Sequence, residues 1–205
     1  MGRTENTYKN SFIIATLLTV MVTKENSERK DRNMNSEIEV RSYCSHDLNQ
    51  VKKILLNYTS PTGRVWNENA VEEMMSDALK EQPDGVFVAE INGEVLGFAI
   101  VIYRDWFNIA YLDYIQVKME WIGKGVGHKL IQKCIKWVEE KGARILYTET
   151  EKNNERANKF YQKHGFKITG SIPDYYQEEI DAVILVRKLL HFKTSFQFRM
   201  SQGAR

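Results

Sequence analysis

Three glycines stand in five positions of the segment WIGKGVGHKL (residues 121–130), at Gly123, Gly125 and Gly127. Each would cost a helix interior about 1 kcal/mol relative to alanine, so the segment is expected to be a loop that opens a helix. Free backbone N–H groups and the helix dipole attract anions there, and glycines let a phosphate approach the backbone. The pattern therefore indicates a phosphate-containing ligand, with a merely tight turn as the plainer interpretation.

Two common nucleotide-binding motifs do not match this loop. A P-loop would close with Gly-Lys-Ser/Thr, which is absent. A dinucleotide fingerprint would require glycine at position 128, where the chain has His128. That fingerprint also follows the first strand of a parallel set, whereas hairpin strands come first here. A dinucleotide oxidoreductase is therefore a distant alternative.

The elements that must position the loop follow from hydrophobic periodicity and turn residues. Asn92-Gly93 predicts a tight hairpin, and Ser45 and Asn67 are expected to cap two helices. The expected strands are 38–44, 86–91, 95–103, 109–117, 144–150, 166–172 and 181–189, and the expected helices are 45–58, 67–82, 125–142 and 153–165. This order predicts one α/β domain with a mixed, mainly antiparallel sheet flanked by helices.

The segment from Gln116 to Phe166 resembles the acetyl-CoA core of the GNAT superfamily of N-acetyltransferases. That family places [Q/R]-x-x-G-x-[G/A] at the start of this helix, and Gly125-Val126-Gly127 matches its end. The family's N-x-x-A, aromatic-Tyr and Gly-Phe are matched by Asn154, Ala157, Phe160, Tyr161, Gly165 and Phe166. The resemblance implies a GNAT-like acyltransferase domain over residues 37–190, with acetyl-CoA as co-substrate and no metal.

The resemblance also implies how acetyl-CoA is held. Backbone amides would cradle its pyrophosphate at Gly123, Lys124, Gly125, Val126, Gly127 and His128. The backbone of Gln116, Val117 and Lys118 would hold the pantetheine and polarise the acetyl carbonyl, while Asn154 would bond the pantetheine arm or simply cap its helix. Ile122 stands where the family has Gln or Arg, so we expect weakened binding, offset in part by Lys124.

Two residues are candidates for the acid–base chemistry that amine acetylation needs. Tyr161 stands where the family keeps the tyrosine that protonates the CoA sulfur, and its alternative role is core packing. Glu149 matches the general base of the branch that acetylates protein amino termini, including ribosomal-protein alanine acetyltransferases. Its alternative is a solvated carboxylate at a strand end, with Asp113 as the substitute base.

The acceptor is predicted less sharply than the donor. Tyr175 and Tyr176 resemble the tyrosine pair that lines the acceptor groove of the same branch, although they could only cover a loop. Residues 58–68 lack that branch's proline-aromatic acceptor loop. We expect an N-acetyltransferase acting on a primary amine, with a protein or peptide α-amine favoured. A small amine (polyamine, amino acid or aminoglycoside-like) and a low-turnover acetyl-CoA sensor are the alternatives.

Composition sets the remaining limits. The chain has 205 residues and a net charge of +2, which does not favour nucleic acid as a partner. Cys44 and Cys134 suggest reduced thiols in a cytoplasmic protein, and the oligomeric state, monomer or dimer, stays open. Residues 1–36 are expected to be a disordered extension or a mis-assigned start, with a membrane-associated tail or an export signal as alternatives. Their apolar run, 12–22, is too short for stable membrane insertion. Residues 191–205 are expected to fray.

Overall fold

The computed structural model describes residues 37–60, 63 and 65–189, so the expectations for 1–36 and 191–205 lie outside the described part of the chain. The strands are β1 (Glu39–Ser42), β2 (Val86–Ile91), β3 (Glu94–Arg104), β4 (Ile109–Val117), β5 (Ile145–Glu151), β6 (Lys167–Gln177) and β7 (Ile180–Lys188). The helices are α2 (Leu48–Leu56), α3 (Glu68–Glu81), α4 (Val126–Glu140) and α5 (Glu155–Lys163). Three short 3-10 turns are η1 (Ser45–Asp47), η2 (Pro83–Gly85) and η3 (Met119–Trp121).

The described strands form one sheet in the order β1-β2-β3-β4-β5-β7-β6. Neighbouring strands are antiparallel except β4 and β5, which are parallel and joined through α4. The predicted hairpin turn joins β2 to β3, with positive φ at both Asn92 (52°) and Gly93 (82°). The predicted mixed, mainly antiparallel α/β fold is therefore confirmed.

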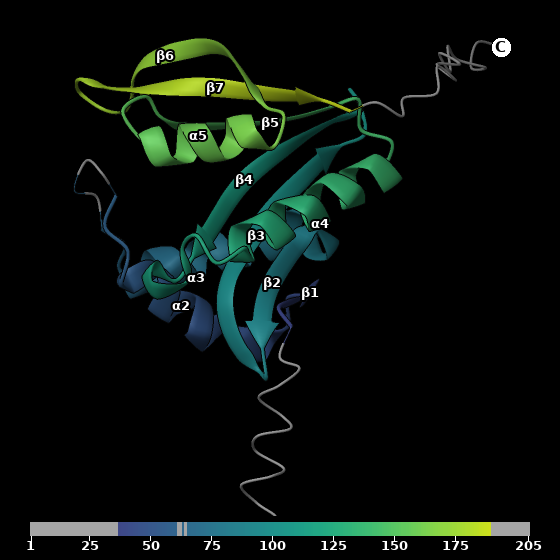
Figure 1. Cartoon of the computed structure of the whole chain (residues 1–205), viewed down its shortest axis with the longest axis vertical. Coiled ribbons are helices and arrows are strands. Elements are labelled where there is room, and N and C mark those ends of the chain that lie inside the picture. The colour runs from purple at the N-terminus through teal and green to yellow at the C-terminus, as the bar shows by residue number, and fades with distance from the viewer. Residues whose placement is uncertain (1–36, 61–62, 64, 190–205) are drawn as a thin grey trace, which may run out of the picture. The chain divides into compact units, whose positions relative to one another are not determined.

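Helices cover both faces of the sheet. Helix α4 packs on one face of β2, β3 and β4, while α2 and α3 pack on the other (Figure 1). The side chains of Leu130, Ile131 and Cys134 in α4 are completely buried, as their spacing predicts. Burying one leucine or isoleucine side chain stabilises a fold by roughly 1.5–3 kcal/mol, so this face anchors α4 and the loop before it.

One predicted helix cap is confirmed and one is wrong. The Asn67 side chain accepts a hydrogen bond from the Ala70 amide at 2.9 Å, which begins α3. Ser45 instead opens η1, and α2 begins only after Asp47. The Asp47 carboxylate accepts from the Cys44 amide at 2.8 Å and pairs with Arg41. These contacts of Asp47 hold the turn at Cys44–Asp47 that precedes α2.

The parallel pair at the centre of the sheet separates along its length. Strands β4 and β5 pair only where Ile109–Tyr111 faces Ile145–Tyr147. Beyond that point the strands diverge, and Figure 1 shows β4 running away from β5 with α5 beside the opening. Past this point β4 still pairs with β3 and β5 with β7, but the edges that β4 and β5 turn toward each other are open and line one space. Within the described residues, no helix has both the length and the apolar character needed to cross a membrane.

Candidate active site

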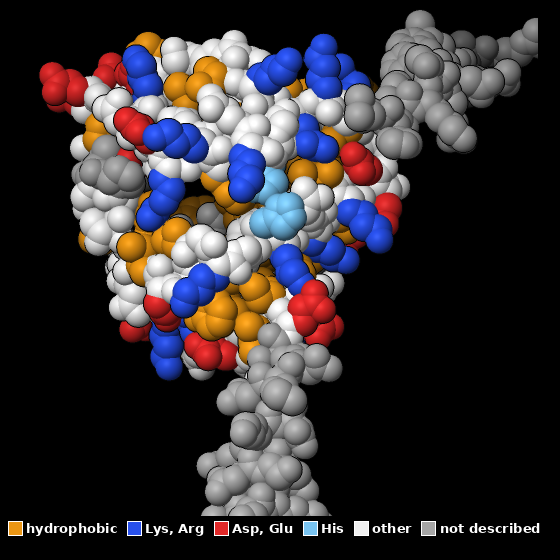
Figure 2. Space-filling model, viewed as in Figure 1, with side chains coloured by type: hydrophobic (Ala, Val, Ile, Leu, Met, Phe, Trp, Pro, Cys, Tyr) orange, Lys and Arg blue, Asp and Glu red, His pale blue; other side chains and the backbone are white. Residues whose placement is uncertain are grey.

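A cavity of about 780 Å³ opens where β4 and β5 separate. One end is bounded by the glycine loop, the start of α4 and α5, and the other by the α2–α3 connection and β6. Figure 2 shows this face hollowed beside lysine, arginine and histidine side chains. The two ends are called below the loop end and the sheet end.

Most of the predicted site residues meet in this cavity. Its lining includes Asp113, Gln116, Val117, Gly123, Gly125, Gly127, His128, Glu149, Asn154, Tyr161, Tyr175 and Tyr176. Three predicted residues are not in the lining. Lys118 forms an ion pair with Glu94 at 2.6 Å, Lys124 is exposed on the loop, and Val126 is fully buried in the core. Any part these three play in binding must therefore come from their backbone or from movement of a side chain.

The glycine loop has a structural reason for each glycine. Gly125, the N-cap of α4, and Gly123 have φ values of 89° and 81°, a region that favours glycine. A Cβ atom built at either position would meet nothing within 4 Å, so the backbone is open on that side. At Gly127 a Cβ would approach the Phe160 ring to 3.3 Å, so this glycine permits close packing of α4 on α5. Gly125 offers no side-chain cap, which leaves the first amides of α4 available to an anion.

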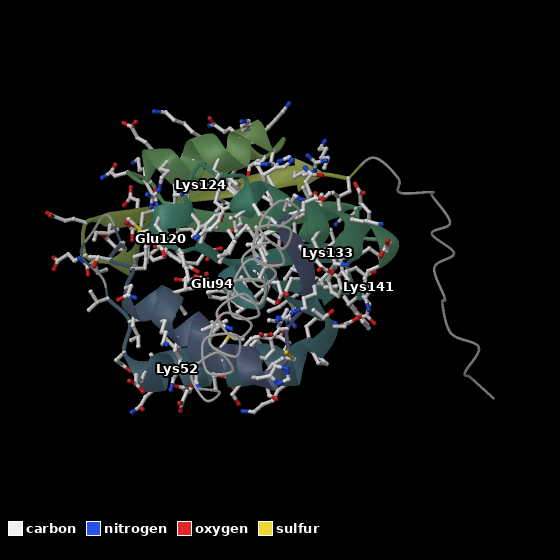
Figure 3. The ribbon with its side chains drawn as sticks, turned by 60° about the horizontal axis from the view of Figure 1, so that its bottom comes forward. Lys52, Glu94, Glu120, Lys124, Lys133 and Lys141 are labelled. Atoms are coloured by element: carbon white, nitrogen blue, oxygen red, sulfur yellow. The ribbon has the colours of Figure 1, made fainter. Side chains whose placement is uncertain are left out.

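Basic side chains gather at the loop end. Arg156 and Lys163 of α5 line the cavity, and both are exposed. The Lys124 ammonium lies over the Trp121 ring, 5.0 Å from its centre. Figure 3 shows Lys124 and Glu120 on the segment before α4, at the opposite end of that helix from Lys141. Positive charge and open helix amides suit a ligand with several phosphates.

Tyr161 and Asn154 place two polar groups on α5. Tyr161 is buried at 7% exposure and still lines the cavity, so packing in the core does not remove it from the candidate site. Burial raises the pKa of its phenol, and the neighbouring Thr148 hydroxyl acts in the opposite direction. Asn154 caps α5 by accepting from the Ala157 amide at 3.1 Å. Because the cap uses only the oxygen, the amide NH₂ of Asn154 remains a donor for a ligand.

Glu149 is half-buried in β5 and bound by two tyrosines. The Tyr111 hydroxyl donates to Glu149 Oε1 at 2.7 Å, and the Tyr175 hydroxyl lies 3.5 Å from the same oxygen. Burial raises the pKa of Glu149 above the usual glutamate value, and the nearby Asp113 acts in the same direction. The Tyr111 hydrogen bond lowers that pKa in part. The plain alternative, a solvated strand-end carboxylate, does not describe this environment.

Asp113 reaches the same environment through a β-bulge. Tyr114 lies opposite Ile100 and Leu112 opposite Val101, which leaves Asp113 as the extra residue of β4. Burial raises the pKa of the Asp113 carboxyl, and the negative charge of Glu81 adds to this. Two carboxylates with raised pKa values therefore share the sheet end.

Aromatic side chains complete the sheet end. Tyr175 and Tyr176 pack edge to face with ring centres 4.9 Å apart. Trp66, from the α2–α3 connection, donates from Nε1 to the Tyr114 hydroxyl at 3.0 Å. All four line the cavity. An acceptor that enters here meets aromatic walls and two carboxylates, which suits an amine.

Several site residues were not predicted from the sequence. Tyr111 had no signal of its own, because its contact with Glu149 joins residues 38 positions apart. Trp66, Tyr114 and Thr148 were missed for the same reason. His164 was expected on the apolar face of its helix through its spacing from Phe160, and it is indeed buried. Its polar contacts with His128 and the Phe160 carbonyl were not expected.

The chain belongs to the acetyltransferase (GNAT) family, whose model matches residues 49–166. Members of this family transfer an acetyl group from acetyl-CoA to an amine, so the chain is an acyltransferase of the N-acetyltransferase class. The match covers α2 through α5 and therefore includes the glycine loop, the diverging strands and Tyr161.

The names of individual relatives state different acceptors. An L-methionine sulfoximine/L-methionine sulfone acetyltransferase from Pseudomonas paraeruginosa is 28% identical over 142 residues, which cover 64% of this chain and 81% of that protein. N-alpha-acetyltransferase 30 from Schizosaccharomyces pombe is 30% identical over 107 residues, covering 51% and 71%. The structure of the ribosomal-protein-S18-alanine N-acetyltransferase from Escherichia coli matches with a TM-score of 0.65 at 22% identity, covering 79% of this chain and 100% of that one. This last likeness shows the fold alone.

Proposed function

We propose that this chain acetylates the α-amino group of a peptide or protein by direct attack of the amine on acetyl-CoA. The observation that supports this most is the placement of Glu149, held by Tyr111, in the same cavity as Tyr161 and the glycine loop. In this arrangement Glu149 can act as the base for the amine and Tyr161 as the proton donor for the sulfur. The proposal includes acetyl-CoA as the donor, and its proton transfers use side chains rather than a metal ion.

The residues divide the reaction between them. The open amides of Gly125 and its neighbours hold the pyrophosphate, and the end of β4 at Gln116 to Lys118, which pairs with β3 but no longer with β5, positions the thioester. Glu149 removes a proton as the amine nitrogen bonds to the carbonyl carbon. Tyr161 donates a proton as the carbon–sulfur bond breaks and the thiol leaves. Both side chains then regain their starting states by exchange with solvent.

Acid–base matching favours an α-amine over a lysine side chain. An α-amine has a pKa near 8 and a lysine amine near 10.4, so the α-amine reaches its neutral form more easily near neutral pH. A glutamate with a raised pKa is a better base for such an amine than an ordinary one. Tyr175, beside Glu149, and Tyr176 would then contact the first residues of the acceptor.

A cytoplasmic location is part of the proposal. Cys44 and Cys134 are both free, and Cys134 is completely buried in α4. Free thiols of this kind suit a reducing compartment.

The test measures CoA release from acetyl-CoA with the full chain and a panel of acceptors. The panel contains peptides that differ in their first residue, the same peptides with blocked amino termini, and small amines such as polyamines and amino acids. Turnover on free peptides that disappears on blocking supports the proposal. Turnover on small amines alone would replace it with metabolite acetylation, and CoA binding without turnover on any amine would replace it with a sensor role.

A further inference from the structure

Two histidines from different helices form a hydrogen-bonded pair at the loop end. Nδ1 of His128, in the first turn of α4, lies 2.9 Å from Nε2 of His164, which directly follows α5. Nδ1 of His164 lies 2.7 Å from the carbonyl oxygen of Phe160. His164 is buried at 7% exposure and His128 is exposed, and both line the cavity.

The Phe160 carbonyl determines which nitrogens carry protons. A carbonyl oxygen only accepts, so Nδ1 of His164 must be the donor to Phe160. In neutral His164, Nε2 is then an acceptor, so Nδ1 of His128 must donate to it. Nε2 of His128 has no hydrogen-bond partner among the residues that the structure describes.

The surroundings of the pair disfavour a charge on the His164 ring. Burial lowers the pKa of His164, and the positive charges of His128, Lys163 and Arg187 act in the same direction. These three side chains come from α4, α5 and β7. Lys124, on the loop before α4, is a fourth positively charged side chain at this end of the cavity. The hydrogen bond to the Phe160 carbonyl opposes this shift only in part, so the neutral form of His164 is favoured. An anion at Nε2 of His128 would stabilise a protonated His128.

The position of His128 suits a ligand at the glycine loop. His128 lines the same cavity as Gly123, Gly125 and Gly127, in the first turn of the helix that this loop opens. Ile122, on the other side of that turn, offers no charge or hydrogen bond. A charged donor at Nε2 would bind a phosphate oxygen more strongly than a neutral donor would.

We propose that the His128 side chain binds the pyrophosphate of CoA in its protonated form, oriented by His164, and supplies the charged contact that Ile122 cannot make. This inference rests on the proposed function, because it takes the glycine loop as the pyrophosphate site. His128 is the binding residue and His164 is a positioning residue that acts through it.

The test is calorimetric titration of the full chain with CoA between about pH 6 and pH 8, in buffers of different ionisation enthalpy. For the unmodified chain we expect proton uptake on binding and an affinity that falls as pH rises. His128→Gln should abolish the uptake and raise the Kd roughly tenfold at the acidic end, the loss of one charge-assisted contact. Lys136→Gln is the control, because it removes an exposed cation from the same helix and should change neither quantity.

Two further measurements separate the roles. His164→Gln can still donate to Phe160 and accept from His128, so it should retain most of the proton uptake, whereas His164→Leu should lose much of it. Dephospho-CoA lacks the 3′-phosphate. Its binding to the unmodified chain should cause the same proton uptake as CoA binding, and its affinity should fall by the same factor in His128→Gln.

Each contrary result has a definite meaning. Absence of proton uptake, or an unchanged Kd in His128→Gln, would overturn the inference while leaving the proposed function intact. If His128→Gln lost affinity for CoA but not for dephospho-CoA, the pyrophosphate assignment would be overturned, because His128 would then contact the 3′-phosphate. Failure of the chain to bind CoA at all would overturn both this inference and the proposed function.

Discussion

The two ends of the cavity differ in the chemical groups that line them. The loop end comes from two continuous stretches, 121–128 and 154–164, and offers mainly helix amides and exposed cations. The sheet end combines side chains from four separate parts of the chain, represented by Trp66, Asp113, Glu149 and Tyr175. Backbone dominates the first and side chains dominate the second.

This difference explains how one scaffold can keep its donor while acceptors vary. Backbone amides remain after most substitutions, so the loop end can accept Ile122 in place of a polar residue. The sheet end depends on each side chain and on the strand geometry that presents it. Changes at one end should therefore affect different kinetic constants from changes at the other.

The largest effect is expected from Glu149→Gln at the sheet end. Loss of the base should lower kcat by about 10²- to 10⁴-fold, since general-base catalysis contributes that much. The Kd for CoA, measured by calorimetry, should change little. Glu155→Gln, an exposed carboxylate paired with Lys159, is the control and should have normal kcat. Normal turnover by Glu149→Gln at every pH would show that Glu149 is not the base.

Gly125→Ala, at the loop end, should weaken acetyl-CoA binding rather than lower kcat as Glu149→Gln does. A Cβ at φ 89° strains the turn and disturbs the amides of α4, so the KM for acetyl-CoA should rise roughly tenfold while the acceptor KM is retained. Gly142→Ala is the matched control, because Gly142 has φ 85° at the other end of the same helix. Both variants should lose about 1 kcal/mol of unfolding free energy in denaturant titrations. An equal rise in KM for both would assign the effect to folding rather than to the loop.

A pair of substitutions should move the acidic limb of the pH–rate profile in opposite directions. The rate should rise with pH as Glu149 loses its proton. Because burial raises the pKa of Glu149, this rise should occur at a higher pH than for an ordinary glutamate. Tyr111→Phe removes a hydrogen bond that lowers this pKa, so the limb should move to higher pH. Asp113→Asn removes a nearby negative charge that raises it, so the limb should move to lower pH. Profiles of kcat/KM that shift the same way in both variants would contradict this account.

The smallest effect is expected from Ile122→Arg. A new cation at the rim of the loop end should tighten CoA binding by about two- to fivefold, the range of an exposed ionic contact. Ile122→Leu is the control and should leave the Kd unchanged. Binding no tighter in Ile122→Arg than in Ile122→Leu would contradict the expectation that Ile122 weakens acetyl-CoA binding.

The sequence alone was sufficient for features that depend on neighbouring residues. Asn92-Gly93 predicted the β2–β3 turn, the glycine cluster predicted the loop before α4, and Asn154 and Gly165 bounded α5. Turns, caps and helix starts are set by backbone conformations that a few adjacent residues prefer, so they can be read from the chain. Most of the loop end is of this kind.

Only the tertiary structure decided the contacts that give the site its chemistry. The bulge at Asp113 depends on the register of β3 against β4, and Tyr111 meets Glu149 because β4 and β5 diverge just beyond their short pairing. His128 and His164 stand 36 positions apart and meet only because α4 packs on α5. Such contacts depend on strand register and helix packing rather than on local preference, and no short stretch of sequence determines them.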